Sequence, residues 1–263
     1  MTQAEFLYLV FCILAGVIGA CVGSFLNVLI YRIPAGESLV KGASHCVGCG
    51  HKIRWYDNIP IFSYLFLRGR CRDCGQRISP RYLLVELLNT ALWLGFALLA
   101  PRTGYAYACT GMLFCSAAVC VGFIDLAHGI IPDRFNLFIL LVGIAACIFD
   151  SYIGWQSRLY GAAFCLAFFG GTYLIARFLL KKEAMGLGDV KFMAVSGLAL
   201  GLKASAFATL TGCVAGAVVL LCVSAARKDE RGTEYPFAPF LAAGCIAAAL
   251  AGEMLVNLYL ALF

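Results

Sequence analysis

Long apolar runs constrain this chain more than any other feature. A helix needs about 20 mostly apolar residues to cross the hydrocarbon core of a bilayer, and the sequence contains eight apolar runs, of which the sixth is shorter than this. They cover residues 5–31, 83–100, 105–124, 135–150, 159–180, 190–202, 204–226 and 238–262. Only 13% of the 263 residues are charged, against about 25% in soluble domains. We therefore predict an all-α polytopic membrane protein with about eight transmembrane helices.

The first apolar run is expected to remain as a membrane helix. Its flank "MTQAE" carries an acid and no base, and the run is too long for the apolar region of a cleavable signal peptide. Ala15, Gly19, Gly23 and Asn27 recur every four residues along it. Such a stripe of small residues lets another helix approach closely, which serves packing within the chain or a dimer equally well.

Basic residues predict the orientation, because lysine and arginine concentrate on the cytoplasmic side of membrane proteins. With eight crossings, 17 of the 20 basic residues fall on one side, and Arg102, Arg158 and Lys203 remain on the other. The alternation holds only if the short run 190–202 crosses. We therefore place both termini outside the cytoplasm, and the turns that follow the third and fifth runs at the cytoplasmic face.

Four of the 14 cysteines lie in the loop after the first run. Cys46 and Cys49 in "CVGCG" and Cys71 and Cys74 in "CRDCG" form two CxxC knuckles separated by 21 residues, each followed by a glycine. Four thiolates suit tetrahedral zinc, and the reducing cytoplasm disfavours disulfides. We predict a structural zinc site, because four protein ligands leave no open position for a substrate. A redox dithiol pair is the alternative.

The cysteine loop is strongly basic. From residue 32 to residue 81 it carries nine basic and three acidic residues, a balance that favours anionic lipid headgroups. The cytoplasmic charge bias already accounts for this balance, so we do not expect nucleic-acid binding. His45 and His51, which flank the first knuckle, are expected to be solvated, and Asp57 is expected to be a solvated or turn residue.

Two aspartates are candidates for chemistry. Asp125 ends the apolar run "CSAAVCVGFID", where the cost of burying an ionisable group indicates a function. Asp189 in "GLGDVKF" is ambiguous by itself, because an aspartate there also suits a helix N-cap. Asp133 follows Pro132 and is expected to cap the next helix, and Asp150 is expected to be a solvated or turn residue at the opposite face.

Taken together, Asp125 and Asp189 indicate proteolysis. Both are predicted at the same membrane face, beside glycines that allow close backbone approach. Two carboxylates a few ångströms apart cannot both ionise easily, so one stays protonated and the other acts as a base. The base takes a proton from water as the water attacks a peptide carbonyl, while the protonated partner polarises the carbonyl oxygen. Because such a pair titrates as a unit, neither role is assigned to one residue.

Six motifs, in order along nearly the whole chain, resemble those of the type IV prepilin peptidases, bifunctional leader peptidases and N-methyltransferases of the bacterial inner membrane. They are "GSFLNVLIYRIP" (23–34), the two knuckles around "HKIRWYDNIPIFSYLFLRGR", "RYLLVELL" (81–88), "IDLAHGIIPD" (124–133), "GLGDVKF" (186–192) and "YPFAPFLAAG" (235–244). Val47, Leu83 and Ala238 depart from the family pattern, and none of these changes removes a reactive group.

The resemblance implies an aspartic endopeptidase of the "GxGD" class in which Asp125 and Asp189 are catalytic. Such an enzyme removes the short basic leader of type IV prepilins, or of type II secretion pseudopilins, after a glycine at the cytoplasmic face. It then methylates the new N-terminal residue with S-adenosylmethionine. The implied partners are prepilin or pseudopilin substrates and the lipid bilayer, and the oligomeric state is open.

The resemblance also divides the chain by function. Residues 1–82, which contain the first helix and the zinc loop, are associated with methyl transfer, and residues 83–263 form the multi-helix peptidase domain. The sequence contains no glycine-rich nucleotide fingerprint that locates the methyl donor. Glu86 is a candidate for orienting the new amine, but packing, or pairing with Arg81, explains this residue as well.

Two other functions fit parts of the sequence. A transporter also carries paired intramembrane acids, but it predicts carboxylates near mid-bilayer and a repeated helix pattern, and the sequence indicates neither. A zinc-dependent scaffold without chemistry would retain its assembly partners when both aspartates are neutralised.

Overall fold

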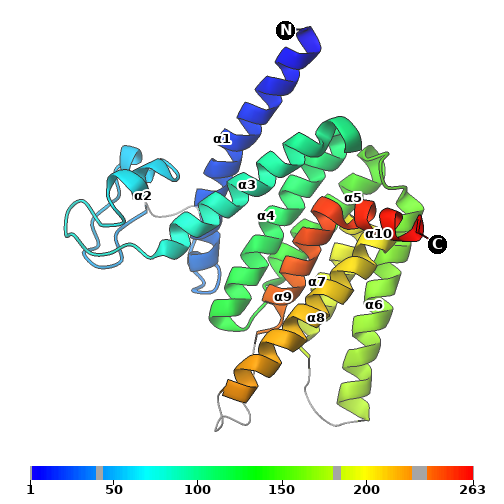
Figure 1. The fold of residues 1–263 in the computed structure, drawn as a ribbon. Helices are drawn as coiled ribbons and strands as arrows, with labels where there is room; N and C mark the ends of the chain where they lie inside the picture. The colour runs from blue at the N-terminus through cyan, green and yellow to red at the C-terminus, as the bar shows by residue number, and fades with distance from the viewer. Residues whose placement is uncertain (1, 40–43, 180–184, 227–235, 263) are drawn as a thin grey trace. The chain divides into compact units, whose positions relative to one another are not determined.

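The computed structural model describes residues 2–39, 44–179, 185–226 and 236–262 (Figure 1). Within them lie α1 (Gln3–Arg32), α2 (Phe62–Phe66), α3 (Pro80–Thr103), α4 (Tyr105–His128), α5 (Asp133–Phe149), α6 (Trp155–Phe178), α7 (Leu187–Leu200), α8 (Leu202–Ala226), α9 (Ala238–Ala247) and α10 (Glu253–Leu260). A 3₁₀ turn (Trp55–Asn58) precedes α2, and a π-helical turn (Ala248–Gly252) joins α9 to α10. Apart from two isolated bridges, the described residues form no β-structure, so the all-α prediction is confirmed.

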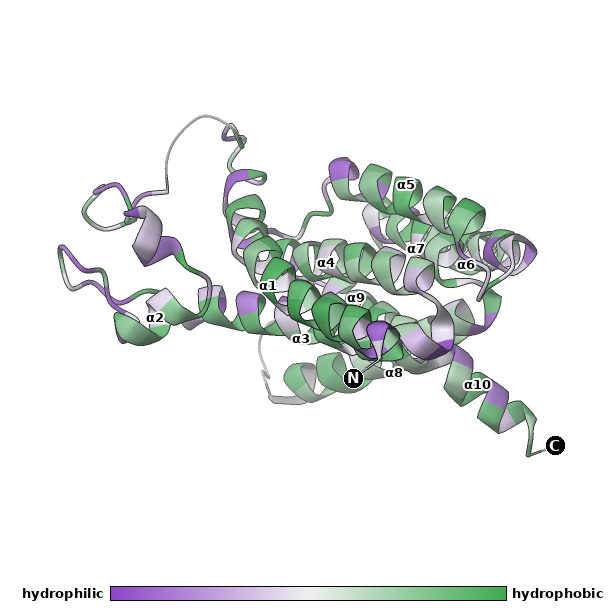
Figure 2. Ribbon diagram, turned by 90° about the horizontal axis from the view of Figure 1, so that it is seen from above, coloured by the Kyte–Doolittle hydropathy of each residue, from purple (hydrophilic) through white to green (hydrophobic). Residues whose placement is uncertain are grey.

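Each predicted span coincides with a helix, but six of the described helices are long and apolar enough to cross a membrane. They are α1, α3, α4, α6, α8 and the continuous helix Ala238–Leu260, and the helices are hydrophobic along most of their length (Figure 2). The other two are shorter, with 17 residues in α5 and 14 in α7. At 1.5 Å per residue α7 is about 21 Å long, against a hydrocarbon core of about 30 Å. The count of eight spans is therefore not confirmed.

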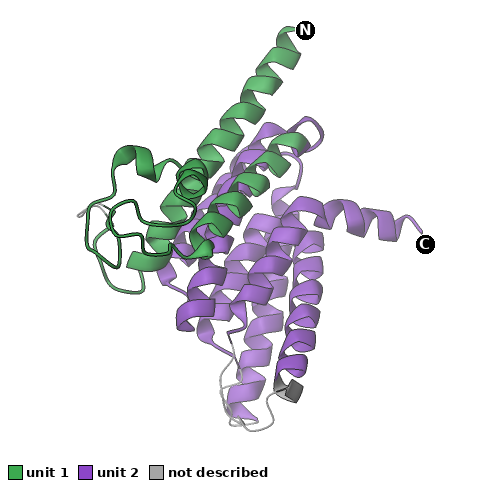
Figure 3. Cartoon of the chain, turned by 60° about the vertical axis from the view of Figure 1, so that its left-hand side comes forward, with its two compact units in different colours: residues 1–98 green, residues 99–263 purple. Residues whose placement is uncertain are grey.

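The chain divides into two compact units, residues 1–98 and 99–263 (Figure 3). The first unit contains α1, α2, the cysteine loop and most of α3, and the second contains α4 to α10. The functional division that we expect between residues 82 and 83 remains a prediction.

In the first unit, α1 packs against α3 through its small residues. A Cβ atom added to Gly19 would lie 2.8 Å from the Cβ atom of Trp93, and one added to Gly23 would lie 2.9 Å from the Cα atom of Glu86. The Asn89 side chain donates a hydrogen bond to the Gly19 carbonyl at 2.7 Å, which satisfies a buried amide. The stripe of small residues on the first helix is therefore a packing face within this unit.

In the second unit, α4 forms the core. Buried residues occur all around this helix and include the unbroken run 114–121, as expected of a helix that is apolar on every side. Helices α5, α7 and α9 pack against α4, and α6 packs against α7. The helices that carry Asp125 and Asp189 therefore both belong to the interior of this unit.

Helices α6 and α7 approach closely at two glycines. A Cβ atom added to Gly197 would lie 2.5 Å from the carbonyl oxygen of Gly161. We expect Gly197→Ala to push the helices apart and to destabilise the protein by about 1–3 kcal/mol, measured as a lower midpoint of thermal unfolding in detergent. Gly171→Ala on α6 is the matched control, because a Cβ atom there meets nothing within 4 Å. Equal midpoints for the two variants would contradict the close packing.

Candidate active site

The four loop cysteines lie together in the first unit. Their Sγ atoms are all within 4.8 Å of one another, and those of Cys46 and Cys74 are 3.8 Å apart. Four thiolates bound to zinc at about 2.3 Å in a tetrahedron lie about 3.8 Å from one another. The positions of these side chains therefore fit a zinc ion with four protein ligands.

The two knuckles share one backbone geometry. The N–H of Cys46 and that of Cys71 each donate to the carbonyl five residues further on, at 2.9 Å and 2.8 Å. Gly50 and Gly75 follow the knuckles with φ angles of 70° and 73°, in the left-handed region that glycine enters at little cost. Gly50 and Gly75 therefore allow a tight turn after each knuckle.

The electrostatics of the cysteine cluster favour a bound cation. The N–H groups of Cys49 and Gly48 lower the pKa of the Cys46 thiol to about 6. At Cys74 the N–H of Gln76 lowers the pKa, but desolvation and the neighbouring thiols together raise it more, to about 12. When no metal is present, an ionised thiolate at one cysteine thus disfavours ionisation of the neighbouring thiols. A metal ion removes this conflict, because it deprotonates the thiols that coordinate it.

Asp57 in the cysteine loop lies in the 3₁₀ turn Trp55–Asn58, so its interpretation as a turn residue is confirmed and its interpretation as a solvated residue is wrong. Its carboxylate accepts hydrogen bonds from Arg72 Nε at 2.9 Å and from Arg72 Nη2 at 2.6 Å, and its side chain is only 8% exposed. This bidentate pair lowers the pKa of Asp57. It also ties the 3₁₀ turn to the second knuckle. His51 is exposed, as expected.

Asp125 lies in the last turn of α4 in the second unit, where it is 7% exposed. Gly129 ends the helix with a φ of 65°, and its N–H donates to the Asp125 carbonyl at 2.8 Å. The carboxylate Oδ2 accepts a hydrogen bond at 3.1 Å from the N–H of Ala238, the first residue of α9. The positive end of the α9 dipole therefore points at this carboxylate.

Asp189 lies in the first turn of α7 and is 9% exposed. The helix begins at Leu187, its N-cap residue is Gly186, and no side chain caps it, so the alternative interpretation of Asp189 as an N-cap is wrong. The Asp189 carboxylate interacts electrostatically with that of Asp125. The fold thus brings the two acids together from helices that lie far apart in the sequence.

Asp133 is the first residue of α5 and does not cap that helix. The N-cap position is Pro132, with no side-chain hydrogen bond, so the predicted cap is wrong. The Asp133 carboxylate instead pairs with Lys191 of α7 at 3.0 Å, and both side chains are exposed. The hydrogen bond from Lys191 lowers the pKa of Asp133, which opposes a role as proton donor.

Glu86 has a backbone partner in the first unit. Its carboxylate accepts a hydrogen bond from the N–H of Ile61 at 2.7 Å. Ile61 has a φ of 65°, which is rare for a β-branched residue. Arg81, the partner considered from the sequence, lies over the ring of Tyr82 instead. Glu86 therefore holds the strained turn that leads into α2.

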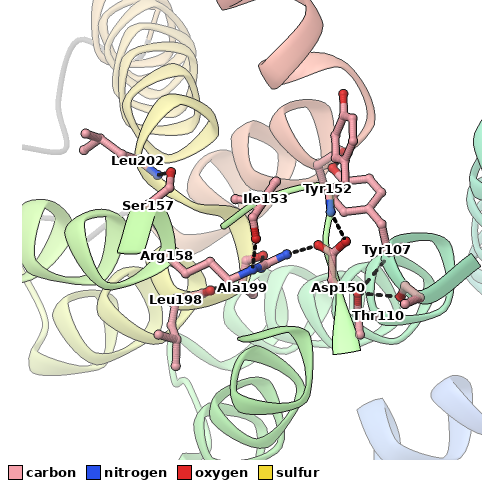
Figure 4. A network of polar contacts seen from close by, with 12 residues as sticks. Tyr107, Thr110, Asp150, Tyr152, Ile153, Ser157, Arg158, Leu198, Ala199 and Leu202 are labelled. Atoms are coloured by element: carbon pink, nitrogen blue, oxygen red, sulfur yellow. Dashed lines mark hydrogen bonds and ion pairs between the residues drawn. The ribbon is translucent and has the colours of Figure 1, made fainter. Parts of the chain in front are cut away.

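Sequence reasoning missed a buried polar network at the α5–α6 turn (Figure 4). Asp150 follows α5 in the turn, as one of its two interpretations predicts, but it is buried and pairs with Arg158, so the interpretation as a solvated residue is wrong. Arg158 is not a loop residue but the fourth residue of α6, and none of its surface is exposed. The sequence signal for this network is an acid and a base eight residues apart between two apolar runs.

The fold and these sites define an all-helical, multi-span membrane protein with a four-cysteine cluster that can hold a metal ion in one unit and a buried acid pair in the other. A model of the bacterial peptidase A24 N-terminal domain matches residues 17–100, and a model of the type IV leader peptidase family matches residues 112–221. The chain belongs to the type IV leader peptidase family, as its motifs predict. Family and fold together make it a multi-pass protein of the inner membrane.

Curated relatives match most of the chain. A protein of Myxococcus xanthus named prepilin leader peptidase/N-methyltransferase is 38% identical over 85% of this chain and 68% of its own length. A protein of the same name from Stutzerimonas stutzeri is 33% identical over 99% of this chain and 98% of its own length. An Escherichia coli protein named type 4 prepilin-like proteins leader peptide-processing enzyme is 36% identical over 89% of this chain and 92% of its own length. No solved structure matches the chain.

Proposed function

We propose that this protein removes the leader peptide of prepilins or of type II secretion pseudopilins and then methylates the new N-terminus. The observation that carries the proposal is the acid pair of Asp125 and Asp189. Both are buried at helix ends of the second unit, and their carboxylates interact electrostatically. The names of the relatives support the same activities.

In the proposed reaction the two aspartates share one proton and act on water. The ionised carboxylate takes a proton from a water molecule as the water oxygen bonds to the scissile carbonyl carbon. The protonated carboxyl group donates to the carbonyl oxygen, which becomes the hydroxyl of a tetrahedral intermediate. When the intermediate collapses, the C–N bond breaks and the proton taken from water passes to the leaving amine. One hydroxyl returns its proton to the other carboxylate as it becomes the carbonyl of the new C-terminus. The N–H of Ala238 holds the Asp125 carboxylate throughout.

The distribution of basic residues supports a reaction at the cytoplasmic face. Three helices, α5, α7 and α9, begin near the acid pair, as the Asp133–Lys191 and Asp125–Ala238 contacts indicate. The loops on that side of the predicted topology carry most of the lysines and arginines. A prepilin enters the bilayer as an apolar helix with a basic leader in the cytoplasm, so its scissile bond would reach the same level. The buried acids attract that leader electrostatically.

Methyl transfer requires S-adenosylmethionine, and we assign it to the first unit through the family resemblance. Zinc bound by Cys46, Cys49, Cys71 and Cys74 supplies folding energy to the loop, because four protein ligands leave no open coordination position. The Asp57–Arg72 pair and the Glu86–Ile61 hydrogen bond hold the remaining loop segments. The loop thereby gains the fixed shape that binding a substrate N-terminus requires.

A reconstitution experiment tests both activities. The purified protein in detergent and lipid is incubated with a prepilin that carries its leader, with and without S-adenosylmethionine, and the products are identified by mass spectrometry. We expect release of the leader in both samples and addition of one methyl group to the trimmed pilin only with S-adenosylmethionine. An intact prepilin after incubation with the folded protein would overturn the proposed function.

Asp133→Asn should leave cleavage almost unchanged. The Asp133–Lys191 pair is exposed, and exposed pairs contribute little to stability. We expect the rate of leader release to stay within about twofold of wild type. Because Lys191 lowers the pKa of Asp133, the pair is complete at neutral pH and is lost only as the pH falls through that lowered pKa. A large loss of cleavage in a folded variant would move Asp133 into the catalytic machinery.

A further inference from the structure

We propose that Arg158 is a positioning residue for the peptidase: its guanidinium holds the C-terminal end of α7 and so fixes the place of Asp189 at the other end of that helix. The inference rests on the proposed function, and all the contacts it uses lie within the second unit.

Arg158 reaches from α6 to the end of α7. Its Nη1 donates to the carbonyl oxygen of Ala199 and, at 3.4 Å, to that of Leu198. Its Nε donates to the carbonyl oxygen of Ile153 at 3.3 Å, and Nη2 pairs with the Asp150 carboxylate. Figure 4 shows the side chain lying between the α5–α6 turn and the last residues of α7. One guanidinium thus joins the turn, α6 and α7.

The carbonyls of Leu198 and Ala199 belong to the last turn of α7, where the helix offers them no partner of its own. A cation at this end also matches the negative end of the helix dipole. The pair with Asp150 neutralises the guanidinium, and Asp150 in turn accepts a hydrogen bond from the N–H of Tyr152 at 2.8 Å. Arg158 is therefore a paired, buried cap rather than an isolated charge.

Helix α7 can transmit this anchoring because it is short and clamped along its C-terminal half. Ala199 lies only ten positions after Asp189, a distance of about 15 Å along the helix axis. Gly197 lies against Gly161 of α6, as the close approach described above requires. A Cβ atom added to Gly143 of α5 would lie 3.1 Å from the Leu198 side chain. A displacement of the C-terminal end of α7 therefore also displaces Asp189.

Stability alone does not account for this network. Replacing a buried ion pair by apolar residues of similar volume is often neutral or stabilising. The forked guanidinium instead fixes the relative positions of its partners, because its N–H groups donate to three carbonyls and one carboxylate at fixed angles. Lysine keeps the charge but presents a single nitrogen, so it cannot hold both the end of α7 and the turn.

Arg158→Lys therefore keeps the positive charge but removes the forked hydrogen-bonding geometry. We expect the variant to fold with an unfolding midpoint close to wild type, to cleave prepilin with a kcat at least tenfold lower, and to keep KM within twofold. The split between kcat and KM is the diagnostic readout, because a misplaced Asp189 slows the chemical step and leaves substrate binding intact. A wild-type kcat in folded Arg158→Lys would overturn the inference.

A second variant and a control complete the test. Asp150→Asn combined with Arg158→Met removes both charges, so neither is left buried alone, and it should also lower kcat at least tenfold. Lys203→Gln is the matched control: Lys203 donates to Asn257 at 2.6 Å and pairs with Glu253 at 4.0 Å, contacts that join α8 to α10, so its kcat should stay at the wild-type value. A wild-type kcat in the folded double variant would overturn the inference. A wild-type protein that leaves prepilin intact would overturn the proposed function and this inference with it.

Discussion

Asp125→Asn and Asp189→Asn should each lower the rate of leader cleavage by about a thousandfold or more. Each change keeps the size of the side chain but removes the carboxylate that carries or accepts a proton, and general acid–base catalysis accounts for about 10² to 10⁴ in rate. Because the acids act on one water molecule as a unit, the double variant should be little slower than either single variant. Leader release measured by mass spectrometry gives all three rates.

The controls separate this loss from misfolding. Both single variants should still methylate a pilin that has already lost its leader, because we assign methyl transfer to the other unit. Asp133→Asn, a neighbouring acid outside the pair, is the matched control and should cleave almost normally. If either Asp125→Asn or Asp189→Asn cleaved at the wild-type rate while folded, that aspartate would have no part in the mechanism.

Loss of zinc should have the second largest effect. We expect about one zinc ion per chain in the wild-type protein, and Cys46→Ser should no longer bind it. Structural zinc sites contribute about 10–16 kcal/mol to the folding of the segments that bind them. The loop should then become sensitive to trypsin, which cleaves after the many basic residues between the knuckles. Metal analysis of the purified protein and limited proteolysis measure the two effects. Lowering the pH should weaken zinc binding, because protons compete for the thiolates.

A cysteine outside the cluster provides the control for zinc. Cys109 lies on α4 and is exposed, so Cys109→Ser should keep both the zinc content and the resistance to trypsin. Removal of zinc by a chelator should reproduce the trypsin pattern of Cys46→Ser in the unchanged protein. A Cys46→Ser protein that retained one zinc ion and a trypsin-resistant loop would rule out the four-cysteine site.

Expectations that depended on one short segment agree best with the structure. The two knuckles gather their four thiols, and Gly50 and Gly75 adopt the left-handed turns that follow them. Expectations about single acids failed more often. Asp57 and Asp150, each interpreted as a solvated or turn residue, lie in turns but are bound by arginines, and Asp133 pairs with Lys191 instead of capping α5. Each failure concerns a partner that the local sequence does not reveal.

By itself, the sequence determined the membrane class of the protein, the approximate position of its long helices, the four candidate metal ligands and the two candidate acids. Run length, CxxC spacing and glycine neighbours are local patterns, and local physical chemistry is enough to interpret them. The tertiary structure alone decided which groups meet. Ala238 donates to Asp125 from 113 residues away, and Arg158 caps the carbonyl of Ala199 from 41 residues away. Such contacts depend on how helices distant in the sequence pack, because buried polar groups take whatever partner the packing brings within hydrogen-bonding distance.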